Sequence, residues 1–118
     1  MIGGDVALAR LPQADGLPKL RPVVLLRQMP PFGDWLVCGV SSQLHHEVVG
    51  FDEIIDRTRD DFLTSGLKSS SLIRLGYLVA LAPSEIAGRL GSISPERHSR
   101  LLQNLSELLL LGSPPKIP

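Results

Sequence analysis

Apolar residues along the chain gather in short runs, and clusters of glycine, proline and charged residues separate these runs. Runs of this kind, bounded by turn signals and rich in valine, isoleucine and leucine, are typical of β-strands. Several are apolar at nearly every position, which favours strands buried on both faces, although periodicity alone does not distinguish them from buried helical segments. We expect strands at residues 5–11, 20–26, 34–40, 72–81 and 89–93, with a further strand or turn segment within residues 47–55.

Turn-forming residues divide the runs. Residues 12–19 contain two prolines and a glycine, which predicts a long loop that makes a hairpin of the first two strands. Residues 65–71 are expected to form a loop, and Gly76 predicts a bulge inside the long strand that follows. Residues 83–86 resemble a single helical turn, and the mixed charges of residues 56–61 are typical of a solvated loop or helix end.

The last part of the chain has a helical pattern. Ser94 is suited to be the N-cap, Pro95 the first helical residue, and Glu96 a favourable anion in the first turn. Gly112 is suited to end the helix. One apolar face is predicted from the leucines that recur at helical spacing, which are Leu101, Leu102, Leu105, Leu108 and Leu109.

Five or six strands followed by one helix, without strand–helix alternation, indicate a mainly β fold. We expect a small, strongly bent antiparallel sheet or barrel with a C-terminal α-helix. A chain of 118 residues is long enough for one domain. We therefore predict a single domain over residues 1–112 and a short proline-rich tail over residues 113–118.

Charge and cysteine content narrow the function classes. Twelve basic residues balance twelve acidic residues, so nucleic-acid binding would require a local basic patch. The single cysteine, Cys38, lies in an apolar strand pattern, where we expect it to belong to the core of a protein from a reducing compartment. The first ten residues lack a signal-peptide pattern, and no apolar run approaches membrane-spanning length. We expect a soluble, cytoplasmic protein.

Arg21 stands directly before Pro22 and a continuous apolar run. Proline cannot donate a hydrogen bond to a sheet ladder, so it belongs at a strand start or on an edge. Arg21 would then lie at the mouth of a rigid strand, where a guanidinium can hold an anion. A plain surface charge is the alternative interpretation.

A polar cluster follows the strand that we expect over residues 34–40. It contains Ser41, Ser42, His45 and His46, and side chains that emerge at the end of a buried strand commonly take part in binding or catalysis. Solvent-exposed loop histidines are the plainer interpretation. A hydrolase triad of Ser41, His45 and Asp52 lacks the nucleophile-elbow motif, and the histidine pair lacks a third metal ligand at convincing spacing.

The order of motifs resembles the PemK/MazF family of toxins from type II toxin-antitoxin systems. The similar stretches are Gly4-Asp5-Val6, Arg21-Pro22-Val23-Val24, Val40-Ser41-Ser42, Ser65-Gly66-Leu67 and Ser94-Pro95-Glu96. They occur in the family's order over residues 4–111. No single motif is specific, and their order and spacing carry the resemblance.

The resemblance implies a β-barrel of the plasmid-maintenance-toxin type, related to SH3-like barrels, usually in a homodimer. It implies a growth-inhibiting, metal-independent endoribonuclease without a cofactor, which cuts single-stranded RNA and is inhibited by a cognate antitoxin. The family's catalytic residues correspond here to Arg21, Ser41 and, for some members, Arg74.

Cleavage without a metal uses the 2′-hydroxyl of RNA as nucleophile, and the protein must supply a proton acceptor and positive charge. Arg21 suits the phosphate best, since its fork matches phosphate oxygens. His45 is a candidate proton acceptor because imidazoles titrate near neutral pH. Phe32, in a proline-rich loop, is a candidate for stacking on a base, whereas Trp35 and Tyr77 are expected in the core. The further candidates for substrate binding are Lys19, Ser42 and His46.

A second hypothesis is a barrel that has lost nuclease activity and binds an antitoxin-like partner or RNA without cleaving it. It rests on three departures from the family pattern. Residues 15–19 lack the usual Glu-Gln before Arg-Pro, Gly76 replaces an acidic residue of some members, and Tyr77-Leu78-Val79 replaces the usual Gln-x-Arg. We favour the enzyme because Arg21, Ser41 and Arg74 are all present.

Overall fold

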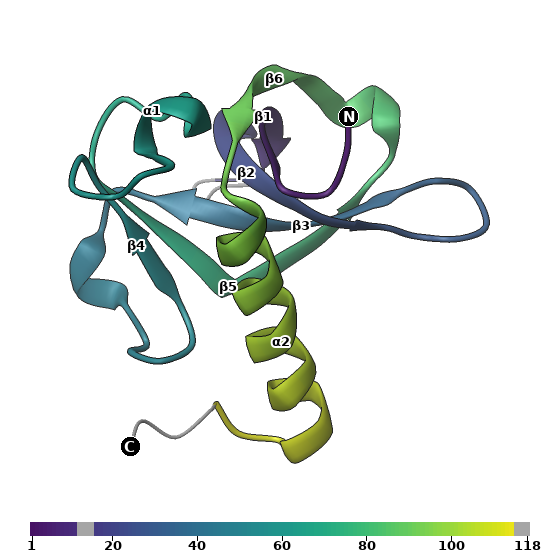
Figure 1. Cartoon of the computed structure of the whole chain (residues 1–118). Coiled ribbons are helices and arrows are strands. Elements are labelled where there is room, and N and C mark those ends of the chain that lie inside the picture. Colours follow the sequence, from purple (N-terminus) through teal and green to yellow (C-terminus); the bar gives the residue numbers. More distant parts are fainter. Residues whose placement is uncertain (12–15, 115–118) are drawn as a thin grey trace.

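The computed structural model describes residues 1–11 and 16–114 (Figure 1). Residues 12–15 of the predicted loop and residues 115–118 of the predicted tail lie outside the described residues. The strands and α-helices are β1 (Asp5–Leu11), β2 (Lys19–Gln28), β3 (Trp35–Ser41), β4 (Glu53–Ile55), β5 (Ser71–Leu81), β6 (Ile86–Ser92), α1 (Phe62–Ser65) and α2 (Pro95–Leu111). Two short 3-10 turns, η1 (Leu44–His46) and η2 (Pro83–Glu85), complete the described structure.

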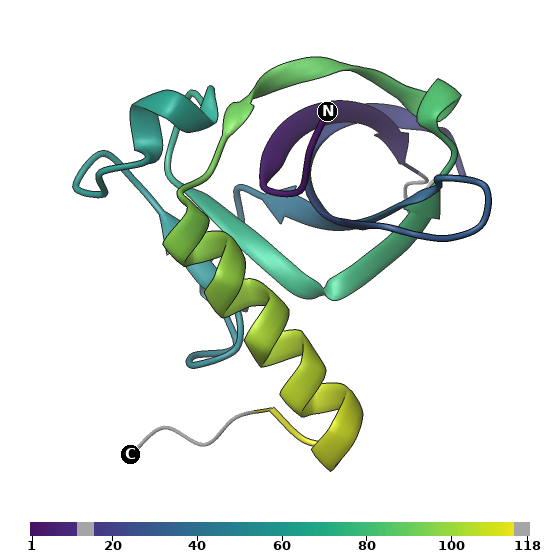
Figure 2. The same cartoon turned by 45° about the vertical axis from the view of Figure 1, so that its right-hand side comes forward.

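The strands form one antiparallel sheet in the described residues, with the order β4-β5-β3-β2-β1-β6. The sheet curls strongly, and Figure 2 shows β6 along the top of the curled sheet and β5 along the bottom, with α2 beside it. This confirms the predicted class, a bent antiparallel β-structure with a C-terminal helix. The helical turn expected at residues 83–86 is η2.

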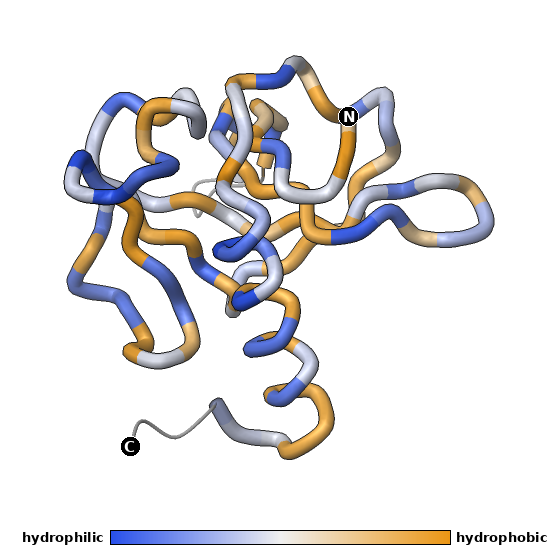
Figure 3. Tube along the Cα trace, in the orientation of Figure 1, coloured by the Kyte–Doolittle hydropathy of each residue, from blue (hydrophilic) through white to orange (hydrophobic). Residues whose placement is uncertain are grey.

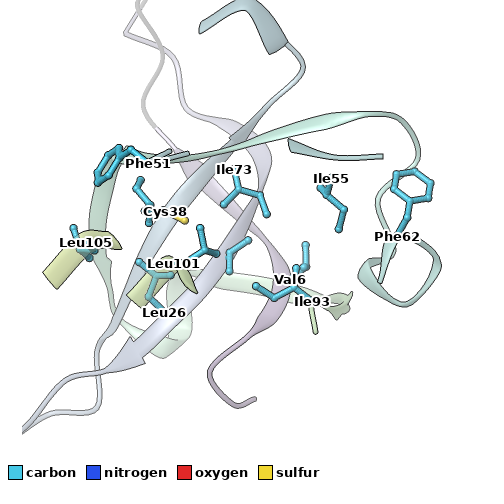
Figure 4. Packing of buried hydrophobic residues seen from close by; sticks show 12 residues of the cluster. Val6, Leu26, Cys38, Phe51, Ile55, Phe62, Ile73, Ile93, Leu101 and Leu105 are labelled. Carbon is cyan, nitrogen blue, oxygen red and sulfur yellow. The ribbon is translucent and has the colours of Figure 1, made fainter. Parts of the chain in front are cut away.

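Strand β2 carries core residues on both faces, as its continuous apolar run predicts. Val24 and Leu26 belong to a cluster that packs against Leu101 and Leu105 of α2, seen from close by in Figure 4. The alternate residues of β2, Val23 and Leu25, belong to a second cluster. Its members are Ala7, Ala9, Leu11, Val23, Leu25, Trp35, Val37 and Leu81. The strand is therefore held between two cores, which makes it a rigid support for its first residues.

Cys38 and Trp35 are buried, as predicted. Burial raises the pKa of the Cys38 thiol to about 12, and the nearby charge of Asp52 acts in the same direction. The thiol therefore stays protonated and unreactive at neutral pH. Cys38 is a packing residue.

Helix α2 begins and ends where the sequence predicts. The Oγ of Ser94 accepts a hydrogen bond from the backbone N–H of Arg97 at 3.1 Å, and Gly112 ends the helix with a φ of 77°. The predicted apolar face is wrong at Leu109, which is 72% exposed. Figures 1 and 3 show that α2 extends beyond the sheet, and Leu109, Leu110 and Leu111 at its end are all exposed.

No helix in the described part of the chain is long and apolar enough to cross a membrane.

The charge-rich segment at residues 56–61 is mostly exposed, as expected, but Asp61 at its end is buried. Its carboxylate accepts hydrogen bonds from Arg97, with Nε at 2.8 Å and Nη2 at 3.1 Å, and from the backbone N–H of Ser94 at 3.0 Å. Nη1 of Arg97 also donates to Glu53 at 2.8 Å, and Arg100 binds Glu53 from the exposed side. These bonds join the start of α2 to β4 and to the loop before α1.

The protonation state of Asp61 reflects this environment. Burial alone raises the pKa of Asp61, but the hydrogen bonds from Arg97 and Ser94 and the charge of Arg97 together hold it below its ordinary value of 3.8. The carboxylate is therefore charged whenever the protein is folded near neutral pH, and the buried Arg97 has a charged partner.

We expect Arg97→Ala to lower the free energy of unfolding by about 3–5 kcal/mol, because it leaves the Asp61 carboxylate buried without its cation. Urea denaturation followed by circular dichroism measures this. Arg100→Ala is the matched control, since Arg100 shares Glu53 but is exposed, and about 1 kcal/mol or less is expected. Equal losses in the two variants would contradict a special role for the buried bridge.

Candidate functional site

A cleft of about 540 Å³ opens where β2, β3 and β5 meet the loop at residues 66–70. Strand β2 contributes Arg21 and Pro22, β3 contributes Ser41, and β5 contributes Arg74. The other polar lining residues with a hydroxyl or amide group are Ser42, Gln43, Ser69, Ser71 and Tyr77. Segments distant in sequence thus gather polar side chains in one hollow.

The charged residues that line this cleft are all basic. They are Arg21, Lys68 and Arg74, and none of the described lining residues is a carboxylate or a histidine. Opposite charges balance over the whole chain, so the cleft is a local basic site in a neutral protein. A hollow lined by one sign of charge attracts ligands of the opposite sign, here a polyanion.

Arg21 is the third residue of β2, which begins at Lys19, one residue before the predicted strand start. It pairs in register with Ala9 of β1, whereas pairing of β2 with β3 starts only at Val23. Residues 19–22 therefore have a sheet neighbour on one side only. Such a local edge tolerates Pro22 and leaves the exposed Arg21 side chain at the rim of the cleft.

Ser41 is the last residue of β3 and lies opposite Leu72 of β5. Its Oγ accepts a hydrogen bond from the backbone N–H of Gln43 at 3.0 Å. A hydroxyl that accepts one bond can still donate its own hydrogen. Ser41 is thus positioned to donate a hydrogen bond to an anionic oxygen in the cleft.

A bulge in β5 shapes the floor of the cleft and confirms the irregularity predicted at Gly76. Cys38 pairs with Leu78, but the next residue of β3, Gly39, pairs with Arg74, so residues 75–77 have no partner on β3. Figure 2 shows the corner that β5 makes along its length. Both Arg74, directly before the unpaired residues, and Tyr77, the last of them, line the cleft.

Asp52 holds this bulge in place. One carboxylate oxygen accepts the backbone N–H of Leu75 at 3.0 Å, inside the unpaired stretch, and the other accepts the N–H of Val48 at 2.9 Å. A buried N–H without an acceptor costs about 1–3 kcal/mol, so the carboxylate removes the main penalty of breaking the ladder. These bonds assign Asp52 to structure, and the triad with Ser41 and His45 receives no support.

The structure brings together Arg21, Ser41, Ser42 and Arg74 among the candidate residues, but four others do not line the cleft. Lys19 is the exposed first residue of β2. His45 and His46 are exposed in η1, with their ring centroids 4.3 Å apart. Phe32 lies before the start of β3, whereas Ser41 is the last residue of that strand. At the usual rise per residue, β3 is about 20 Å long.

Sequence reasoning missed Lys68 and Tyr77. The sequence signal for Lys68 is the glycine two residues before it, Gly66. In the structure Gly66 has a φ of 74°, and it lies so close to the Leu90 carbonyl oxygen that no side chain would fit. The loop therefore passes tightly over β6 and carries Lys68 to the cleft. The expectation that Tyr77 belongs to the core holds in part, since its ring packs against the second core cluster while also lining the cleft.

Among the described residues, no three histidine, cysteine or acidic side chains lie close enough to hold a metal ion.

Comparisons with known proteins identify relatives. Residues 3–109 match the family model described as the PemK-like, MazF-like toxin of type II toxin-antitoxin systems. A search among curated proteins found no match. Among solved structures, the Mycobacterium tuberculosis toxin MazF-mt6 is similar at 15% sequence identity, with a TM-score of 0.66 over 89% of this chain and 95% of that chain. At this identity the solved structure supports the fold alone.

We expect Asp52→Asn to destabilise the protein by about 1–3 kcal/mol, because an asparagine amide offers one acceptor where two N–H groups need one each. Urea denaturation measures the change. Asp60→Asn, at an exposed acidic residue between β4 and α1, is the control, with an expected change within about 0.5 kcal/mol. A shift for Asp52→Asn no larger than that of the control would show that the bulge does not need the carboxylate.

Proposed function

The chain belongs to the PemK-like, MazF-like toxins of type II toxin-antitoxin systems, and we propose that it is an endoribonuclease that cuts single-stranded RNA in the cytoplasm without a metal ion and thereby inhibits growth. The observation that carries the proposal is the cleft lined by Arg21, Lys68 and Arg74 with no described carboxylate among them. Such a cleft suits the phosphate backbone of RNA.

The proposed reaction uses groups of the RNA itself. The 2′-oxygen loses its proton to a base and attacks the adjacent phosphorus, and the bond from phosphorus to the 5′-oxygen of the next nucleotide breaks. The leaving 5′-oxygen takes a proton from water, so a 2′,3′-cyclic phosphate and a 5′-hydroxyl result. Arg21 and Arg74 would stabilise the negative charge that grows on the phosphoryl oxygens, because a guanidinium offers positive charge and a fork of hydrogen-bond donors. The Ser41 hydroxyl donates a further hydrogen bond to the same oxygens.

We propose that His45 accepts the proton of the 2′-hydroxyl. Gln43 lines the cleft, and His45 is two residues further along in η1, with an exposed ring. Among the basic side chains at or beside the cleft, an imidazole is the one that commonly accepts a proton near neutral pH. His46, Lys19 and Phe32 are proposed as contacts to the parts of the strand that leave the cleft.

A type II toxin has an antitoxin protein as its partner, and we extend the proposal to a homodimer. The support is exposed apolar surface: Leu109, Leu110 and Leu111 are each more than 70% exposed at the end of α2. Leucines gathered in this way on a protein surface commonly mark a contact with another protein.

The second candidate is a toxin-fold protein that binds RNA or an antitoxin-like partner without cleavage. One observation favours it: no described residue that lines the cleft is a histidine or a carboxylate, the usual groups for proton transfer. The experiments below separate the two candidates.

We expect the purified protein to cleave single-stranded RNA in the presence of EDTA, and Arg21→Ala to lower the rate by about 100-fold or more, as for other lost charge-stabilising donors. Arg27→Ala is the matched control, because Arg27 is an exposed arginine of the same strand outside the cleft. The rate is measured by the release of labelled fragments. RNA that binds in an Arg21-dependent manner but stays intact would favour the second candidate.

We expect His45→Gln to lower the cleavage rate by about 10²-fold or more, because general-base catalysis contributes that much, while RNA binding remains. His46→Gln provides the comparison, since the two rings are neighbours and both residues are exposed to solvent. Single-turnover cleavage with saturating protein separates the chemical step from binding. Unchanged cleavage by His45→Gln would remove His45 from the reaction and leave the role of Arg21 intact.

A further inference from the structure

Tyr77 is the aromatic side chain of the cleft, and no other described aromatic residue lines it. Trp35, Phe51 and Phe62 are buried in the two cores, and Phe32, which lies before the start of β3, is 84% exposed. The ring of Tyr77 is half-buried, so part of it packs inside and part is accessible from the cleft.

The position of the Tyr77 ring depends on Gly39 of β3. A side chain at Gly39 would place its Cβ 3.2 Å from Cδ1 of the ring and 3.4 Å from Cγ. The ring thus lies directly against the backbone of β3, and glycine leaves the space for it. Contact with the second core cluster supports the ring as well, so two sets of packing contacts hold Tyr77 beside the cleft.

The β5 bulge brings the ring and the charges together. Arg74 is the residue in register with Gly39, and Tyr77 lies three residues later across the unpaired stretch, so a guanidinium and an aromatic ring come from neighbouring positions of one strand. Arg21 and Lys68 line the same cleft. Cations for the phosphates and a rigid ring for a base are the two components of a site for single-stranded nucleic acid.

We propose that Tyr77 is a stacking platform for one nucleobase of the bound RNA, and that it positions the strand so that the adjacent phosphate reaches Arg21 and Arg74. This inference rests on the proposed ribonuclease function. It assigns the stacking role to Tyr77 in place of Phe32, and it makes Tyr77 a residue that contributes to the choice of sequence at the cleavage site. Stacking tolerates every base but favours those with larger rings.

The experiment measures the binding of a short, fluorescently labelled 2′-O-methyl RNA of mixed sequence, in EDTA, by fluorescence anisotropy. The methyl group blocks the attacking hydroxyl, so binding is observed without cleavage. Tyr77→Leu removes the ring but keeps apolar bulk, and we expect about 5- to 150-fold weaker binding. Tyr77→Phe keeps the ring and is expected to recover most of the affinity.

The salt dependence of binding distinguishes stacking from charge. Arg21→Ala removes a phosphate contact, so its plot of log affinity against log salt concentration should become shallower by about 0.7. Tyr77→Leu should weaken binding with the slope unchanged, because stacking releases no counterions. Thermal denaturation of each variant establishes that it is folded.

A second measurement needs no variant that must fold. In oligonucleotides with one abasic nucleotide placed at successive positions, we expect a single position to weaken binding to the unaltered protein by a factor similar to Tyr77→Leu. Unchanged affinity of Tyr77→Leu, with a shallower salt slope for Arg21→Ala, would overturn the stacking role and keep the RNA site. No binding by the unaltered protein would overturn the proposed function itself, and the stacking role with it.

Discussion

The break in pairing between β3 and β5 is the constraint on which the cleft depends. Residues 75–77 of β5 lose their partners on β3, and the Asp52 carboxylate accepts the freed N–H of Leu75. A sheet that kept regular pairing here would present Arg74 and Tyr77 in regular register with β3. The bulge bends β5, and it brings both side chains to one hollow. A buried carboxylate outside the cleft thus determines the geometry inside it.

Two further contacts complete the frame around the cleft. The buried pair of Arg97 and Asp61 joins α2 to the loop before α1, and the close approach of Gly66 to the Leu90 carbonyl seats the loop that follows α1 on β6. Between them, these contacts hold the segment that carries Lys68. The basic character of the cleft therefore depends in part on contacts made by residues other than its three cations. It arises in a chain whose charges balance overall.

Sequence reasoning reached the elements of the site that lie on strands. Arg21, Ser41 and Arg74 were identified from strand patterns and from the order of motifs, and all three line the cleft. It was less successful for the remaining candidates. Lys19, Phe32, His45 and His46 do not line the cleft, because the path of the chain at the ends of strands and in loops depends on distant contacts.

The sequence accounts for most of the strands, the caps of α2, the bulge at Gly76 and the burial of Cys38, because these follow from local apolar runs, turn residues and capping groups. It placed β6 three residues too late and left β4 as a strand or turn. Tertiary structure alone decided that Asp61 is buried, that Leu109 is exposed and that Tyr77 lies on Gly39 at the cleft. Each of these depends on what a residue far away in the chain places next to it. Arg97 is 36 residues from Asp61, and Gly39 meets Tyr77 only because β3 and β5 are neighbours in the sheet. The periodicity of the sequence indicates which face of an element is apolar, whereas tertiary packing decides which residues that face contacts.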